Sequence, residues 1–129
     1  MARILIVEDE IAQRNYLATL LRHHDYEPIQ AEDARSILDL VEEIRPDLIL
    51  LDVVMPSLSG LAAATLIRSN PSLQKTPIVL MSGHRINRDE LDRAGITEFV
   101  QKPFRGDQLI NVVRRALGEQ YAPRDADWS

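Results

Sequence analysis

The sequence predicts an α/β fold in which a doubly wound, five-stranded parallel sheet carries helices on both faces. Short apolar runs, typical of strands buried on both faces, alternate with segments whose apolar residues recur at helical spacing. One such run is Leu48–Leu51, which follows Pro46 and Asp47 and ends shortly before Pro56. Because right-handed crossovers place connecting helices on both sides of a parallel sheet, this alternation predicts a doubly wound domain.

The strands differ in how well they fit the middle of a sheet. The segment 26–30 is a weak strand because Pro28 removes a ladder donor, and a sheet edge tolerates that loss best. The flavodoxin-like order 2-1-3-4-5 places this second strand at an edge and the third strand near the centre. The predicted strands are residues 2–8, 26–30, 47–52, 76–82 and 96–100.

The helices are recognised by apolar residues three and four positions apart and by the residues that end them. Asn70 and Pro71 end the third helix, since proline cannot continue a helix. Gly95 and Gly118 follow the fourth and fifth helices, and glycine is common just past a helix end. The predicted helices are residues 10–23, the segment whose apolar face runs from 34 to 44, 59–69, 86–94 and 105–118.

Composition limits the class of protein. The 129 residues suffice for one domain, expected at 1–118, and the polar residues 119–129 are predicted to form a frayed tail. The chain has no cysteine, which excludes disulfides and thiolate metal sites, and no apolar run approaches the roughly 18–20 residues of a membrane span. A net charge of −5 argues against nucleic-acid binding by this domain alone. We expect a cytoplasmic protein that does not enter a membrane.

The carboxyl edge of the predicted sheet gathers several reactive side chains. Glu8 and Asp9 follow the first strand, Asp52 and Ser82 end the third and fourth, and Lys102 follows the fifth. Any one of them alone is typical of a helix cap or a solvated loop, but together they indicate a site. Clustered carboxylates repel one another unless a cation intervenes, and such an oxygen cluster suits Mg²⁺. A carboxylate nucleophile, a metal, a lysine and a hydroxyl are the parts that phosphoryl transfer needs.

Four segments around the predicted strand ends form a set of motifs: residues 4–10 (ILIVEDE), 46–56 (PDLILLDVVMP), 77–83 (PIVLMSG) and 102–104 (KPF). Together they resemble the receiver domain of two-component response regulators, in its stand-alone, chemotaxis-regulator-like form. The resemblance covers about residues 2–118. It implies a phosphorylation-controlled binding switch that is not an enzyme and assists only its own phosphorylation and dephosphorylation. A sensor histidine kinase or a histidine phosphotransfer protein would donate the phosphoryl group.

The resemblance implies a role for each matched residue around the acidic cluster. Asp52 would accept the phosphoryl group and form an acyl phosphate. Asp9 would bind Mg²⁺ directly and Glu8 through a water, with Asp52 and the backbone carbonyl of Val54 as further ligands. Lys102 would pair first with Asp52 and then with the phosphoryl group.

The resemblance also implies how the switch would work. The bond between Lys102 and Pro103 is expected to be cis, which would aim the lysine inward. Ser82 would move toward the phosphoryl group, and Phe99, at the aromatic switch position, would rotate inward with it. Phe99 lacks the hydroxyl of the commoner tyrosine, so a switch through that hydroxyl is not expected. The fourth helix, fifth strand and fifth helix would then bind a downstream protein, with the chain a monomer or a phosphorylation-dependent dimer.

Two alternatives remain open at this point. The chain could be a receiver fragment of a longer regulator or hybrid kinase. It could also be a phosphohydrolase with an aspartyl nucleophile. Enzymes of the haloacid-dehalogenase type usually carry that nucleophile after the first strand with a second Asp two residues on, whereas here Asp52 follows the third strand and Val54 fills that place. A flavodoxin-like cofactor binder is disfavoured, because the acidic residues 8–10 would repel a phosphate without a metal.

Overall fold

A computed structural model of the protein describes residues 1–31, 37–53 and 59–119. It contains a five-stranded sheet in the order β2-β1-β3-β4-β5, and every neighbouring pair of strands is parallel. The predicted fold class and strand order are therefore confirmed, and the strand with Pro28 lies at an edge. The strands are β1 Arg3–Val7, β2 Glu27–Ala31, β3 Leu48–Asp52, β4 Ile78–Ser82 and β5 Glu98–Gln101.

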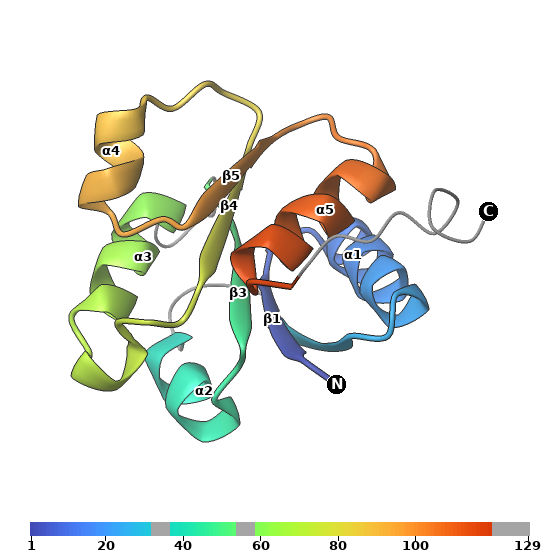
Figure 1. The fold of residues 1–129 in the computed structure, drawn as a ribbon, viewed down its shortest axis with the longest axis horizontal. Coiled ribbons are helices and arrows are strands. Elements are labelled where there is room, and N and C mark those ends of the chain that lie inside the picture. The colour runs from blue at the N-terminus through green and yellow to red at the C-terminus, as the bar shows by residue number, and fades with distance from the viewer. Residues whose placement is uncertain (32–36, 54–58, 120–129) are drawn as a thin grey trace.

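The helices form a layer on each face of the sheet, as predicted. In Figure 1, α1 and α5 lie together on one side, and α2, α3 and α4 lie on the other. No helix in the described ranges is long and apolar enough to cross a membrane. The helices are α1 Ile11–His23, α2 Ile37–Ile44, α3 Gly60–Arg68, α4 Arg88–Arg93 and α5 Gly106–Ala116, and a short 3₁₀ helix, η1, covers Pro71–Leu73.

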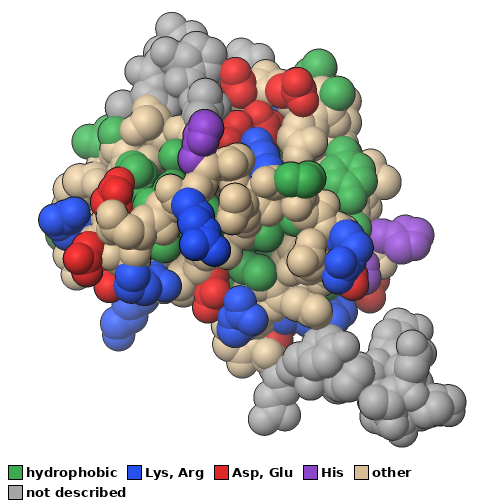
Figure 2. Space-filling view, turned by 90° about the horizontal axis from the view of Figure 1, so that it is seen from above, with side chains coloured by type: hydrophobic (Ala, Val, Ile, Leu, Met, Phe, Trp, Pro, Cys, Tyr) green, Lys and Arg blue, Asp and Glu red, His purple; other side chains and the backbone are tan. Residues whose placement is uncertain are grey.

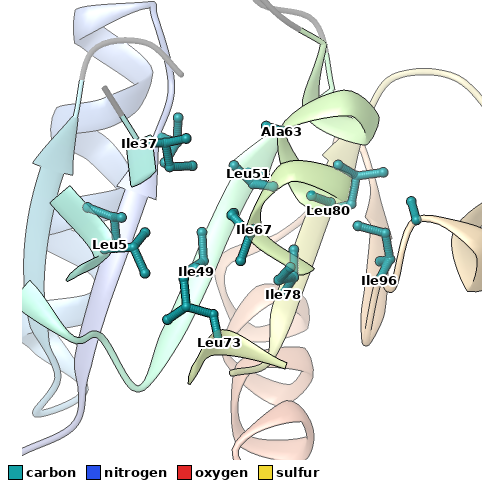
Figure 3. Packing of buried hydrophobic residues seen from close by; sticks show 14 of the residues in the cluster. Leu5, Ile37, Ile49, Leu51, Ala63, Ile67, Leu73, Ile78, Leu80 and Ile96 are labelled. Carbon is teal, nitrogen blue, oxygen red and sulfur yellow. The ribbon is translucent and has the colours of Figure 1, made fainter. Parts of the chain in front are cut away.

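Successive residues of the central strands enter two different cores, because side chains alternate between the faces of a sheet. Leu50 of β3 packs on the side of α1 and α5, whereas its neighbours Ile49 and Leu51 pack on the side of α2 and α3. Figure 3 shows the second of these cores, where Ile67 of α3 lies against β3 and β4. Every residue of β3 and β4 is buried, so the sheet is a rigid support for whatever follows its strands.

The boundaries differ from the sequence prediction where a capping side chain sets them. The prediction missed η1, which begins because the Asn70 side chain accepts a hydrogen bond from Ser72 N at 3.0 Å and Pro71 suits the first position of a helix. The helix α4 is shorter than predicted because Asn87 caps it, accepting a bond from Glu90 N at 2.8 Å. The predicted tail beyond 119 and the start of the predicted helix at 34 lie outside the described residues.

Gly60 brings α3 into close contact with the strand that carries Asp52. A Cβ atom at this position would collide with the Asp52 carbonyl oxygen and lie 2.9 Å from Val53 Cα. The Gly60 amide also donates to the Val53 carbonyl at 2.9 Å. The absence of a side chain at Gly60 thus lets the start of the helix fix the end of β3.

Candidate functional site

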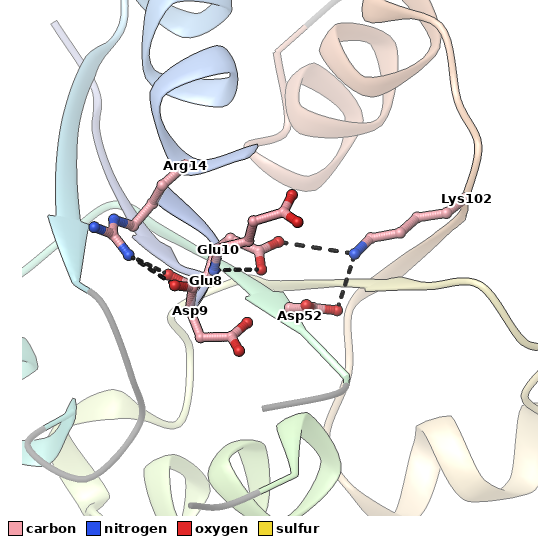
Figure 4. Close-up of polar contacts among 6 residues, drawn as sticks. All are labelled: Glu8, Asp9, Glu10, Arg14, Asp52 and Lys102. Atoms are coloured by element: carbon pink, nitrogen blue, oxygen red, sulfur yellow. Dashed lines mark hydrogen bonds and ion pairs between the residues drawn. The ribbon is translucent and has the colours of Figure 1, made fainter. Parts of the chain in front are cut away.

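Three carboxylates meet at the carboxyl ends of β1 and β3. Each of Glu8, Asp9 and Asp52 offers an oxygen, and these oxygens lie within 4.8 Å of one another. The strands bring them together because Val7, the last residue of β1, is paired with Leu51 next to Asp52. Glu8 and Asp52 are only 2% and 5% exposed, whereas Asp9 is exposed. We call these three residues the acidic cluster; Figure 4 shows them from close by.

Lys102 reaches the acidic cluster from the segment after β5. Its Nζ lies 3.1 Å from Asp52 Oδ1 and 3.7 Å from Glu8 Oε1. The peptide bond between Lys102 and Pro103 is cis. The Lys102 amide donates to the Ser82 carbonyl at 2.7 Å, which ties this segment to the end of β4. The space-filling view in Figure 2 shows acidic side chains gathered beside a basic one on this face of the molecule.

The charge on the acidic cluster is only partly compensated by protein groups. Burial, followed by repulsion from Asp52, raises the pKa of Glu8 to about 7. The Glu10 amide, which donates to Glu8 Oε2 at 3.3 Å, and the positive charge of Lys102 act in the opposite direction. Within the described residues, Glu8 Oε1 is a buried oxygen without a hydrogen-bond partner. A hard divalent cation with oxygen ligands, such as Mg²⁺, fits this donor set.

Ser82 ends β4 beside the acidic cluster, and its side chain is fully buried. Its hydroxyl donates to the His84 carbonyl at 2.9 Å and accepts from the His84 amide at the same distance. Both bonds lie within the segment that leads from β4 to α4. In this conformation the serine proton is therefore used by that segment and not by the acidic cluster.

Phe99 lies on β5 and is half-buried against the core beneath α3 and α4. It lines a surface hollow of about 510 Å³ together with Ile86, Asn87 and Glu90. Val54, whose backbone carbonyl was expected to complete the metal ligands, lies outside the described residues.

A second hollow, of about 590 Å³, opens beside the acidic cluster between α1 and the segment after β5. Its lining includes Glu8 and Lys102, together with the aromatic side chains of Tyr16 and Phe104. Tyr16 is 48% exposed, so an aromatic surface lies next to the charged groups. The hollow leaves the charged site accessible from outside the molecule.

Sequence reasoning missed Arg14, which is only 9% exposed although it carries a charge. A signal was present, because Arg14 stands at the first position of the buried face of α1, followed at helical spacing by Leu17, Ala18 and Leu21. A charged residue on an apolar stripe needs hydrogen-bond partners. The partners of Arg14 include the backbone carbonyls of Glu8 and Asp9, two residues of the acidic cluster.

Comparison with known families decides which kind of site this is. The family model for the response regulator receiver domain matches residues 4–114. The chain belongs to the response regulator receiver family. Receiver domains are signalling domains of two-component systems and bind Mg²⁺ at an acidic pocket, and Glu8, Asp9 and Asp52 form a cluster of carboxylates in this receiver domain.

Relatives include both longer proteins and proteins of similar length. Regulatory protein AtoC from Escherichia coli is 36% identical over 117 residues, 89% of this chain but 25% of AtoC. The chain spans 17% to 51% of the length of AtoC and three other curated relatives. The polar-differentiation response regulator DivK from Brucella anthropi is 28% identical over 118 residues, which are 90% of this chain and 96% of DivK.

Solved structures give the same result for the fold. The chemotaxis protein CheY4 from Vibrio cholerae superposes with a TM-score of 0.85 at 29% identity, covering 90% of this chain and 98% of that structure. A receiver domain of a signal transduction histidine kinase from Syntrophus aciditrophicus has a TM-score of 0.83 at 30% identity, covering 92% of this chain and 91% of that structure.

Proposed function

We propose that this receiver domain accepts a phosphoryl group on Asp52 from the phosphohistidine of a sensor histidine kinase or a histidine phosphotransfer protein. The observation that carries the proposal is the ion pair between Asp52 Oδ1 and Lys102 Nζ, 3.1 Å apart, beside the carboxylates of Glu8 and Asp9. A buried carboxylate with a fixed cation on one side and a metal-binding group on the other is suited to phosphoryl transfer, which depends mainly on positioning and charge neutralisation.

In this reaction a lone pair of an Asp52 carboxylate oxygen forms the O–P bond of an acyl phosphate. The N–P bond of the phosphohistidine breaks, and its electron pair returns to the imidazole nitrogen. Glu8, Asp9, Asp52 and the Val54 carbonyl would hold Mg²⁺, which when bound neutralises charge on the phosphoryl oxygens. Lys102 transfers its contact from Asp52 to a phosphoryl oxygen. The hollow beside α1 opens at Glu8 and Lys102, the neighbours of Asp52, and the donor histidine would approach from that side.

Phosphorylation would change the β4–α4 segment through Ser82. A serine hydroxyl has one proton, and in this structure that proton is donated to the His84 carbonyl. Donating it to a phosphoryl oxygen breaks that bond and frees the segment to move. Phe99 follows inward, and the surface formed by α4, β5 and α5 changes shape for a downstream protein target.

We take residues 1–118 as the domain that does this. It acts in the cytoplasm as a monomer or a phosphorylation-dependent dimer, and it is not an enzyme, since it assists only its own phosphorylation and dephosphorylation. It functions alone, as DivK-like relatives suggest, or as the receiver part of a longer regulator or hybrid kinase, as relatives such as AtoC suggest.

Intact mass spectrometry after incubation with acetyl phosphate and Mg²⁺ tests the proposal. We expect one phosphoryl group on the wild type and none on Asp52→Asn or in the presence of EDTA. Glu43→Gln, which changes an exposed carboxylate on α2 outside the hollow, serves as the control and should be phosphorylated normally. An adduct that persists in Asp52→Asn, or no adduct on the wild type under conditions where it binds Mg²⁺, contradicts the assignment of Asp52.

A further inference from the structure

Arg14 connects α1 to the turn that carries two residues of the acidic cluster. Its Nη1 donates to the Glu8 carbonyl at 2.8 Å and to the Asp9 carbonyl at 3.4 Å. Its Nε lies 3.4 Å from Oε1 of Gln30 on β2. Figure 4 shows the guanidinium at the backbone of this turn, on the side opposite the Lys102 ammonium. Arg14 thus contacts the frame of the site, whereas Lys102 contacts its carboxylates.

The two carbonyls that Arg14 contacts belong to the peptide units on either side of the Asp9 Cα. Holding both units restricts φ and ψ of Asp9, and these two dihedrals are the only soft ones of its backbone. They set the direction of its Cα–Cβ bond and hence where its carboxylate points. Asp9 is exposed, so packing of its own side chain does not fix that direction. On the other side of the turn, the Glu8 amide donates to the Ala31 carbonyl of β2 at 3.2 Å.

We propose that Arg14 is a positioning residue for divalent-cation binding: its guanidinium holds the Glu8–Asp9 backbone so that the Asp9 carboxylate faces Asp52 before the cation arrives. The inference rests on the proposed function, because it takes the acidic cluster to be the metal site. Groups that orient metal ligands from behind affect metal affinity strongly although they do not touch the ion. Arginine suits this role because its planar fork can donate several hydrogen bonds in fixed directions.

The sign of the effect separates positioning from charge. Arg14 carries a positive charge near the place where a cation would bind, so by Coulomb's law alone its removal strengthens cation binding. If Arg14 holds the turn, its removal weakens binding, because Asp9 must be ordered at the moment of binding. The two explanations predict changes in opposite directions.

The experiment measures the dissociation constant of Mn²⁺, a Mg²⁺ substitute, from the free-ion EPR signal of the unphosphorylated protein. Arg14→Met keeps the aliphatic length and removes every donor. We expect about a tenfold weaker affinity, in the range that loss of a ligand-orienting group produces. Arg14→Lys retains the charge but not the fork, and should also bind more weakly than the wild type. Arg22→Met, an exposed arginine on the same helix, is the control and should leave the affinity unchanged.

Urea unfolding without metal shows whether each variant is folded. If Arg14→Met is unfolded, the Mn²⁺ affinities of Arg14→Lys and Gln30→Leu test the role of Arg14 instead. Gln30→Leu removes the exposed partner of Arg14 Nε and is expected to weaken Mn²⁺ binding about twofold. Unchanged or tighter Mn²⁺ binding in the folded variants overturns the role of Arg14. Absence of Mn²⁺ binding by the wild type would instead contradict the proposed metal site, so the two failures are distinguishable.

Discussion

The substitution Glu8→Gln should stabilise the metal-free protein at alkaline pH and have little effect at acidic pH. In the wild type, burial and the nearby Asp52 raise the pKa of Glu8 from 4.5 to about 7. A group whose pKa is raised on folding contributes stability that is complete below its unfolded pKa and is lost as pH rises through its folded pKa. Glutamine has the same shape and cannot ionise, so the variant escapes this loss.

The size of the effect follows from the same two pKa values. A rise from 4.5 to about 7, at about 1.4 kcal/mol per pKa unit, corresponds to about 3.5 kcal/mol of unfolding free energy. The side chain of Glu8 is 2% exposed, so solvent screens its charge little. Bound Mg²⁺ would neutralise the negative charge of the ionised Glu8 carboxylate. At about pH 8, Mg²⁺ should therefore stabilise the wild type more than it stabilises Glu8→Gln.

Urea unfolding at about pH 5 and about pH 8, in EDTA and in Mg²⁺, measures these differences. Other groups titrate over the same range, but the difference between wild type and Glu8→Gln isolates one carboxylate. Glu10→Gln makes the same charge change at an exposed neighbour and should show no comparable pH dependence. A wild-type-to-variant difference that is equal at both pH values would refute the reasoning.

Three further substitutions, one of them with a matched control, test other contacts. Gly60→Ala should lower the free energy of unfolding in urea by about 2 kcal/mol, because the new Cβ meets the end of β3. Gly83→Ala is the control: its Cβ would meet no atom within 4 Å, so the free energy of unfolding should change by less than about 0.5 kcal/mol. Lys102 lowers the pKa of Glu8, so in Lys102→Met the loss of unfolding free energy that accompanies ionisation of Glu8 should occur at higher pH. An unchanged dependence of the unfolding free energy on pH would contradict this. Tyr26→Phe should cost about 1 kcal/mol below pH 10, since it removes the 2.8 Å bond to a Glu119 oxygen. Burial and that bond raise the pKa of Tyr26 to about 12, so the stabilisation by this bond is lost as pH rises through that value. An ordinary tyrosine pKa in an absorbance titration would contradict the predicted effect of the bond.

The sequence predicted the fold because each strand and helix is defined by local pattern. Strands buried on both faces read as continuous apolar runs, as Leu48–Leu51 does, and Pro28 could belong only at an edge. Gly95 and Gly118 have φ of 74° and 75°, which explains why glycine marked these helix ends. The short helix η1 was missed because Asn70 and Pro71 both end one helix and begin another, and the sequence pattern does not separate these roles.

The membership of the site was predictable for a different reason: topology alone brings the ends of parallel strands to one edge. This placed Glu8, Asp9, Asp52 and Lys102 together before any distance was known, whereas the roles of Ser82 and Phe99 stay predictions. The hydrogen bonds between Ser82 and His84 could not be predicted, because they depend on the backbone path of one loop. The position of Arg14 on the apolar stripe of α1 could be read from the sequence, but its partners could not, since the direction of its side chain depends on its rotamer and on a turn five residues earlier in the chain.

The two basic residues at the site control different properties of it. Lys102 contacts the carboxylates and lowers the pKa of Glu8, so it sets how much of the cluster's charge is compensated. Arg14 contacts the backbone carbonyls of Glu8 and Asp9, so in the role proposed for it Arg14 affects where the carboxylates point. A cluster whose geometry is held by the backbone can leave its charge incompletely balanced in the folded protein. That imbalance destabilises the metal-free domain at neutral pH, and it also favours the binding of a divalent cation at the cluster.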